Sequence, residues 1–102
     1  MTTIYKAEIG EITEEEIGKK CIQLWGESDQ IRQSIEELSE LIVVLAKWGR
    51  NVNGSSEHMI CDELADVEVM CKQLRLIFNS NKVDTLKKVK LERLYDRVVN
   101  ES

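Results

Sequence analysis

Residues 31–48 read IRQSIEELSELIVVLAKW, and this stretch decides the fold expected for the chain. Apolar side chains recur along it at steps of three and four residues: Ile31, Ile35, Leu38, Ile42 and Leu45. This spacing is typical of the core-facing stripe of an amphipathic helix. Residues 41–46 are apolar on every side of such a helix, so they must be buried on every side. A single small bundle has little room for that, so part of this helix is expected to meet another subunit.

The segment before this stretch also has the signature of a helix. Thr13 stands three residues before a glutamate, a capping-box pattern that predicts a helix running to about Trp25. Gly26 breaks that helix, and Ser28 is expected to cap the next one, over about residues 29–48.

Two further helices are expected in the second half of the chain. Ser55 or Ser56 follows a stretch rich in turn formers and is expected to cap a helix that runs to about Phe78. Residues 79–81 break this helix, and a last helix is expected over residues 84–99.

Composition bounds the class of protein. The chain has 102 residues, no proline and five glycines, which favours long helices in one domain. We therefore expect residues 1–102 to form a single all-α domain, an antiparallel bundle of about four helices completed by oligomerisation. Residues 1–11 are expected to be extended or disordered.

Charge and cysteine content limit which partners and which cellular location are expected for this chain. The net charge of −5 argues against nucleic acid as a partner, because nucleic-acid binders usually carry a basic face. No apolar run approaches the ~20 residues that span a bilayer, so no membrane partner is expected. The three cysteines match no zinc motif and no signal peptide precedes them, which predicts a cytoplasmic protein with reduced thiols.

Two acidic motifs indicate the chemistry: Glu36-Glu37-x-x-Glu40 and Glu63-x-x-Asp66. The spacing i,i+3 places Glu37 with Glu40, and Glu63 with Asp66, on one face of a helix. At about 100° per residue, Glu63 and Asp66 fall on an apolar arc. Glu37 and Glu40 border another. Antiparallel packing would gather four carboxylates, which repel each other unless divalent cations bind between them.

All four of these expected ligands are oxygen donors, which favour Mg²⁺, or Mn²⁺ in its place, over zinc. The single histidine, His58, is expected at the rim. A different class of protein stays open as an alternative, a non-catalytic helical interaction protein whose acidic rows pair with basic partners.

The run of Trp25-Gly26, Gln30, the first acidic motif and then the second resembles the MazG-like family of all-α nucleoside triphosphate pyrophosphohydrolases, over roughly residues 20–80. The resemblance implies Mg²⁺-dependent hydrolysis of a nucleoside triphosphate to the monophosphate and pyrophosphate, in house-cleaning of the nucleotide pool. It also implies a homodimer or homotetramer that shares its helical bundle between subunits.

Residue roles follow from the same resemblance. It implies that Glu37, Glu40, Glu63 and Asp66 are the metal ligands. Glu36 would be a further ligand or the group that positions or deprotonates the attacking water, and either Glu36 or Glu37 would accept its proton. Seven basic residues form the pool of expected phosphate contacts: Lys47, Arg50, Lys72, Arg75, Lys90, Arg93 and Arg97.

Alternative substrates stay open within this family. Phosphoribosyl-ATP pyrophosphohydrolases and dimeric dUTP or dCTP hydrolases share the carboxylate arrangement. Many members have an asparagine in the closing helix where this chain has Leu94, so the family's base and sugar contacts are not transferred to this chain.

Overall fold

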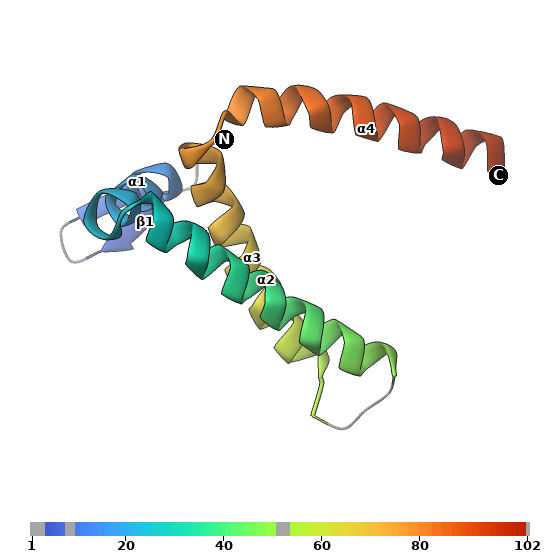
Figure 1. Ribbon diagram of the computed structural model, residues 1–102, viewed down its shortest axis with the longest axis horizontal. Helices are drawn as coiled ribbons and strands as arrows, with labels where there is room; N and C mark the ends of the chain where they lie inside the picture. Colours follow the sequence, from blue (N-terminus) through green and yellow to red (C-terminus); the bar gives the residue numbers. More distant parts are fainter. Residues whose placement is uncertain (1–3, 8–9, 51–53, 102) are drawn as a thin grey trace.

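The computed structural model describes residues 4–7, 10–50 and 54–101, which form a β-hairpin followed by four helices (Figure 1). The elements are β1 (Ile4–Ala7), β2 (Gly10–Thr13), α1 (Glu14–Trp25), α2 (Glu27–Gly49), α3 (Glu57–Ile77) and α4 (Ser80–Glu101). The helical class and the four helices are confirmed. β1 and β2 pair as antiparallel strands in and just beyond the stretch expected to be extended or disordered, residues 1–11, of which residues 1–3 and 8–9 lie outside the described residues.

The ends of α1 and α3 show how local sequence starts and stops these helices. The Thr13 hydroxyl accepts a hydrogen bond from the Glu16 amide at 3.2 Å, as the capping pattern predicted. Ser56 caps α3 in the same way, accepting from the Met59 amide at 3.2 Å. Gly26 separates α1 from α2 with φ +88° and ψ 157°, a conformation that is essentially restricted to glycine. The expected cap from Ser28 is wrong, because α2 already begins at Glu27 and has no side-chain cap.

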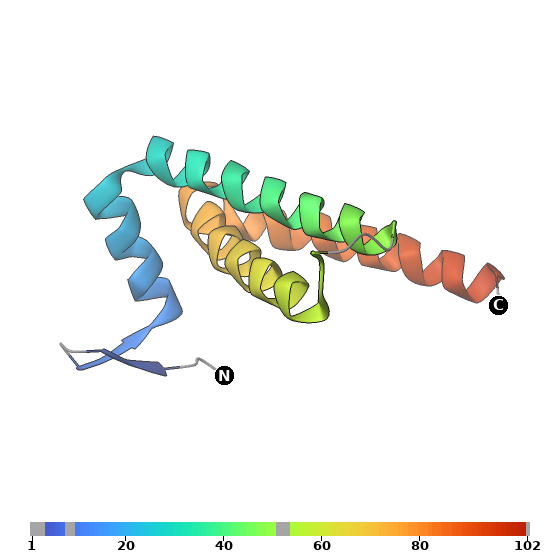
Figure 2. The same ribbon diagram turned by 90° about the horizontal axis from the view of Figure 1, so that it is seen from below.

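α2 and α3 run antiparallel and side by side, and this pair forms the centre of the fold (Figures 1 and 2). Each helix turns one row of buried and half-buried side chains inward: on α2, Gln30, Ser34, Glu37, Leu41 and Val44; on α3, Glu63, Val67, Met70 and Gln73. The members of each row are three or four residues apart, so each row is one continuous helix face.

The row of α2 that packs against α3 is not the apolar stripe predicted from the sequence. Ile35 is 60% exposed and Ile42 is 66% exposed, so that stripe lies on the outer side of α2. Helical periodicity identifies an apolar face, but it does not identify the surface that covers it. Here α3 covers the row that contains Ser34, whose side chain is small and whose hydroxyl bonds back to the Gln30 carbonyl at 2.8 Å.

α1 lies across the same pair and packs on both α2 and α3. Its buried residue is Gly18. A Cβ atom at Gly18 would lie 2.8 Å from the Cδ1 atom of Leu76, so the absence of a side chain lets α1 approach α3 closely.

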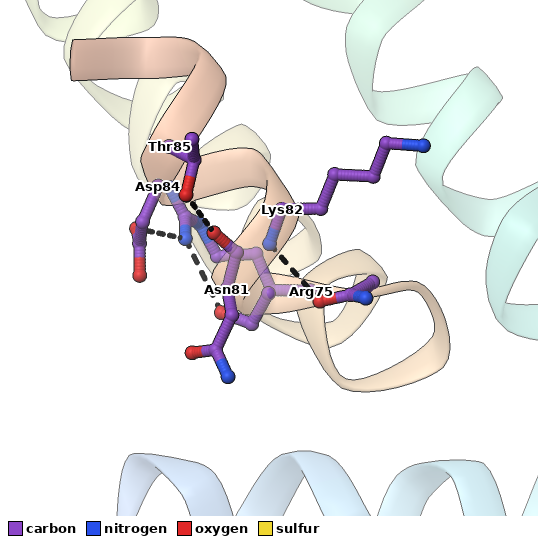
Figure 3. A network of polar contacts seen from close by, with 7 residues as sticks. Arg75, Asn81, Lys82, Asp84 and Thr85 are labelled. Atoms are coloured by element: carbon purple, nitrogen blue, oxygen red, sulfur yellow. Dashed lines mark hydrogen bonds and ion pairs between the residues drawn. The ribbon is translucent and has the colours of Figure 1, made fainter.

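α4 leaves the other helices at a corner and then extends away from them (Figures 1 and 2). The Asn79 side chain accepts from the Lys82 amide at 3.0 Å, which caps α4 and starts it at Ser80, earlier than the predicted residue 84. Arg75 holds the corner by donating to Asp84 at 2.7 Å and to the Ser80 hydroxyl at 3.3 Å (Figure 3). Every residue from 81 to 101 is exposed.

Within the described ranges, no helix combines the length and the apolar character needed to cross a bilayer.

Candidate metal centre

Carboxylates from α2 and α3 converge where the two inward rows meet. Glu37, Glu63 and Asp66 each offer one oxygen, and these three oxygens all lie within 4.8 Å of one another. Glu40 lies near enough to Glu63 for its negative charge to raise the pKa of that carboxyl. The antiparallel packing of two i,i+3 pairs therefore brings Glu37, Glu63 and Asp66 together, with the exposed Glu40 beside Glu63.

Electrostatics in this cluster disfavour ionisation. The pKa of Glu63 is raised, first by burial and then by repulsion from and hydrogen bonding to Glu40, with smaller effects from the charges of Asp66 and Glu37. The pKa of Asp66 is also raised, first by burial and then mainly by the negative charge of Glu37. Both shifts have the sign expected of carboxylates that share a site without a cation.

Basic side chains do not compensate this charge. Among the described residues, no lysine or arginine forms an ion pair with any of the four carboxylates. The Oε2 atoms of Glu37 and Glu63 are buried and have no hydrogen-bond partner in the described part of the chain. Buried acceptors without partners are costly. The site therefore offers unpaired oxygen ligands to a cation.

The donor set suits a hard divalent cation. The converging atoms are carboxylate oxygens, which Mg²⁺ and Mn²⁺ prefer. His58 is exposed on the first turn of α3, and neither it nor a cysteine joins the described cluster.

The remaining residues expected at the site are dispersed. Glu36 is exposed on α2 beside the cluster but not in it. Lys47 and Lys72 are half-buried without an ion pair among the described residues, and Arg50 follows the end of α2. Arg75 is engaged by Asp84 at the α3–α4 corner. The other three expected phosphate contacts lie exposed along α4: Lys90, Arg93 and Arg97.

Three glutamines belong to the same region: Gln30, Gln33 and Gln73. Gln33 and Gln73 were not predicted from the sequence, and Gln30 entered only through the family resemblance. Gln33 donates from Nε2 to Oε1 of Glu37 at 2.9 Å and so orients that carboxylate. Gln30 and Gln73 are each 5% exposed on the inward rows. Helical spacing could have identified both residues from the sequence. Gln33 precedes Glu37 by four residues and Gln73 follows Asp66 by seven, so each shares a helix face with a carboxylate of the cluster.

Fold and site together define a class: a small helical protein with a carboxylate cluster between two antiparallel helices. Comparison with known protein-family models, with characterised proteins and with solved structures finds no match to this chain. The residues of the carboxylate cluster and their geometry are therefore the basis for assigning a function.

Proposed function

We propose that this protein is a Mg²⁺-dependent nucleoside triphosphate pyrophosphohydrolase of the MazG-like all-α kind, acting in house-cleaning of the nucleotide pool. One observation carries the proposal: the carboxylates of Glu37, Glu63 and Asp66 meet between α2 and α3, and no basic side chain pairs with them among the described residues. Glu40 lies beside them. The order and spacing of the two acidic motifs support it through their resemblance to that family.

The carboxylates of Glu37, Glu40, Glu63 and Asp66 would hold Mg²⁺. When bound, the cation neutralises charge on the triphosphate and lowers the pKa of a water molecule. Gln33 keeps the Glu37 carboxylate in place through its 2.9 Å hydrogen bond. Mn²⁺ would serve in place of Mg²⁺ at such an oxygen site.

The reaction is a displacement at the α-phosphorus. The water oxygen forms a bond to that phosphorus, the bond from it to the oxygen bridging to the β-phosphorus breaks, and pyrophosphate leaves. Glu36 or Glu37 accepts the proton of the water, and Glu37 is the one of the two that lies in the cluster.

The active assembly is proposed to be a homodimer or a homotetramer. The outer stripe of α2 and the free length of α4 expose apolar side chains that no described helix covers: Ile35, Leu38, Ile42, Leu45, Leu91, Leu94 and Val98. Contiguous apolar surface of this kind usually marks a protein interface. A second copy would complete the bundle.

Substitution of single ligands tests the activity. Asp66→Asn and Glu40→Gln should each abolish Mg²⁺-dependent release of pyrophosphate from a panel of nucleoside triphosphates, while the helical circular-dichroism spectrum is kept. Glu68→Gln, at an exposed position of α3 outside the cluster, is the matched control and should keep wild-type activity. Full activity in either variant would contradict the assignment of these carboxylates as metal ligands. Adding dUTP, dCTP and phosphoribosyl-ATP to the panel separates the alternative substrates.

Metal titration separates an enzyme from a non-catalytic interaction protein. Binding to the native state alone stabilises a protein, so Mg²⁺ or Mn²⁺ should raise the Tm of the wild type in a saturable way. Asp66→Asn should lose most of that rise. A solvated acidic face would give the same small shift in both proteins.

A further inference from the structure

A hollow lies beside the carboxylate cluster, where α1, α2 and α3 meet. Its volume is about 340 Å³, and its lining includes Trp25 from the end of α1, Gln30 and Gln33 from α2, and Met70 and Gln73 from α3. We call it the amide pocket, because three side-chain carboxamides line it. The proposed phosphate chemistry at the carboxylates does not use it.

Two of these carboxamides belong to buried residues, and one of them has a buried oxygen without a hydrogen-bond partner among the described residues. Gln73 is 5% exposed, and its Oε1 atom is buried and accepts no hydrogen bond in the described part of the chain. Gln30 is also 5% exposed, and the hydrogen bond that it receives from the Ser34 hydroxyl goes to its main-chain carbonyl. Buried polar groups are normally hydrogen-bonded, so the unpaired Gln73 oxygen in the wall of a hollow indicates a place for a ligand that donates a hydrogen bond.

The amide pocket and the carboxylate cluster are linked by one shared side chain. Gln33 belongs to both, because it lines the hollow and donates to Glu37 at 2.9 Å. Gln30 precedes Glu37 by seven residues, and Gln73 follows Asp66 by seven residues, a rise of about 10.5 Å along each helix. An extended nucleotide reaches over such a length from its base to its phosphate chain.

We propose that the amide pocket binds the nucleobase of the nucleoside triphosphate, and that Gln30 and Gln73 recognise the base by hydrogen bonds to its edge. The proposal rests on the proposed pyrophosphohydrolase function and adds to it the place where the base is recognised. A carboxamide presents a donor and an acceptor side by side, which matches the paired donor and acceptor on a base edge. Trp25 is 57% exposed, so its indole can stack on the base, and the Met70 thioether offers a soft apolar floor.

Removal of each amide tests the assignment. Gln73→Met and Gln30→Met keep the length of the side chain and remove the hydrogen-bonding group. Each should lower kcat/KM for the preferred nucleotide by roughly ten- to a hundred-fold. Each should also reduce the differences in kcat/KM between nucleotides that carry different bases. The Mg²⁺-dependent rise in Tm should be kept in the same variants, because neither amide belongs to the carboxylate cluster.

Stability and a matched control show whether the loss is specific. Gln73→Met removes an orphaned buried acceptor, so its Tm should equal or exceed that of the wild type. Gln23→Met makes the same change at an exposed position of α1 outside the pocket lining and should leave the base ranking intact. A wild-type base ranking in both pocket variants, or equal rates for all bases in the wild type, would overturn the pocket while leaving the proposed function in place.

A binding measurement tests the pocket without catalysis. Trp48→Phe leaves Trp25 as the single tryptophan. Nucleoside monophosphates should then quench its fluorescence in a saturable, base-dependent way, and Gln73→Met should weaken that binding. If no triphosphate is hydrolysed but quenching occurs, the proposed function fails and the pocket stands. Absence of quenching by every monophosphate overturns the pocket.

Discussion

At the scale of single residues, the most informative feature is that carboxylates are held together without a paired counter-charge in the described part of the chain. Burial and the neighbouring carboxylates raise the pKa of Glu63 and of Asp66. Glu37 is held in the same group by Gln33. In the proposed metal-dependent enzyme, a bound cation would relieve this repulsion.

The pH dependence of stability follows from the sign of those shifts. A carboxyl group whose pKa is higher in the folded than in the unfolded chain stabilises the fold when protonated, and that stabilisation is lost as the pH rises through the raised pKa. Urea unfolding of metal-free protein, in steps upward from pH 4, should therefore show a loss of stability in the wild type that is smaller in Glu63→Gln and in Asp66→Asn. Saturating Mg²⁺ should offset the loss at neutral pH. The same pH profile in wild type and both variants would contradict the raised pKa values.

At the scale of the elements, the junction of α1 and α2 sets how α1 lies across the central pair. Gly26 provides this junction with φ +88° and ψ 157°. Close packing of Gly18 against Leu76 then requires α1 to keep that direction. The amide pocket depends on the same junction, because Trp25 and Gln30 lie on either side of it.

Gly26→Ala should therefore destabilise the protein. A side chain in this backbone region costs about 1–3 kcal/mol, which corresponds to a drop of several degrees in the Tm of a domain of this size. Gly49→Ala is the control, since a Cβ there meets nothing within 4 Å and the backbone is not strained. Scanning calorimetry of the two variants at one protein concentration makes the comparison. Equal Tm values would show that the junction tolerates a side chain.

At the scale of the whole molecule, the four described helices do not form a closed bundle. The central pair and α1 bury few apolar side chains, and α4 extends away from them (Figure 1). The apolar side chains of α4 are exposed. The expected phosphate contacts Lys90, Arg93 and Arg97 lie on this extended helix. In the proposed oligomer, α4 of one copy would pack on another copy.

Disruption of the outer stripe of α2 tests this assembly. Ile42→Asp places a charge where the proposed interface is apolar and should convert the oligomer to a monomer with a lower Tm, because an unpaired buried charge is costly. Gln23→Asp, an exposed substitution on α1, should keep the wild-type assembly. Sedimentation velocity over a range of protein concentrations measures both. A wild type that sediments as a monomer would contradict the proposal.

Local features of this protein were predictable from the sequence. Thr13 and Ser56 cap their helices as their spacing indicated, because a cap needs only residues within one turn. The pairing of Glu63 with Asp66 on one face follows from the helical repeat alone. The early start of α4 was missed because Asn79, taken as part of a helix break, acts as the cap.

Tertiary structure decided what covers each face. Sequence periodicity ranked Ile35 and Ile42 as core, yet α3 packs on the row that holds Ser34 and Glu37. The meeting of α2 carboxylates with those of α3, and the enclosure of Gln73 beside Gln30, likewise appear only once the helices are packed. The physical reason is that the helical repeat fixes directions within one helix, whereas the rotation of one helix against another depends on the shapes of both surfaces.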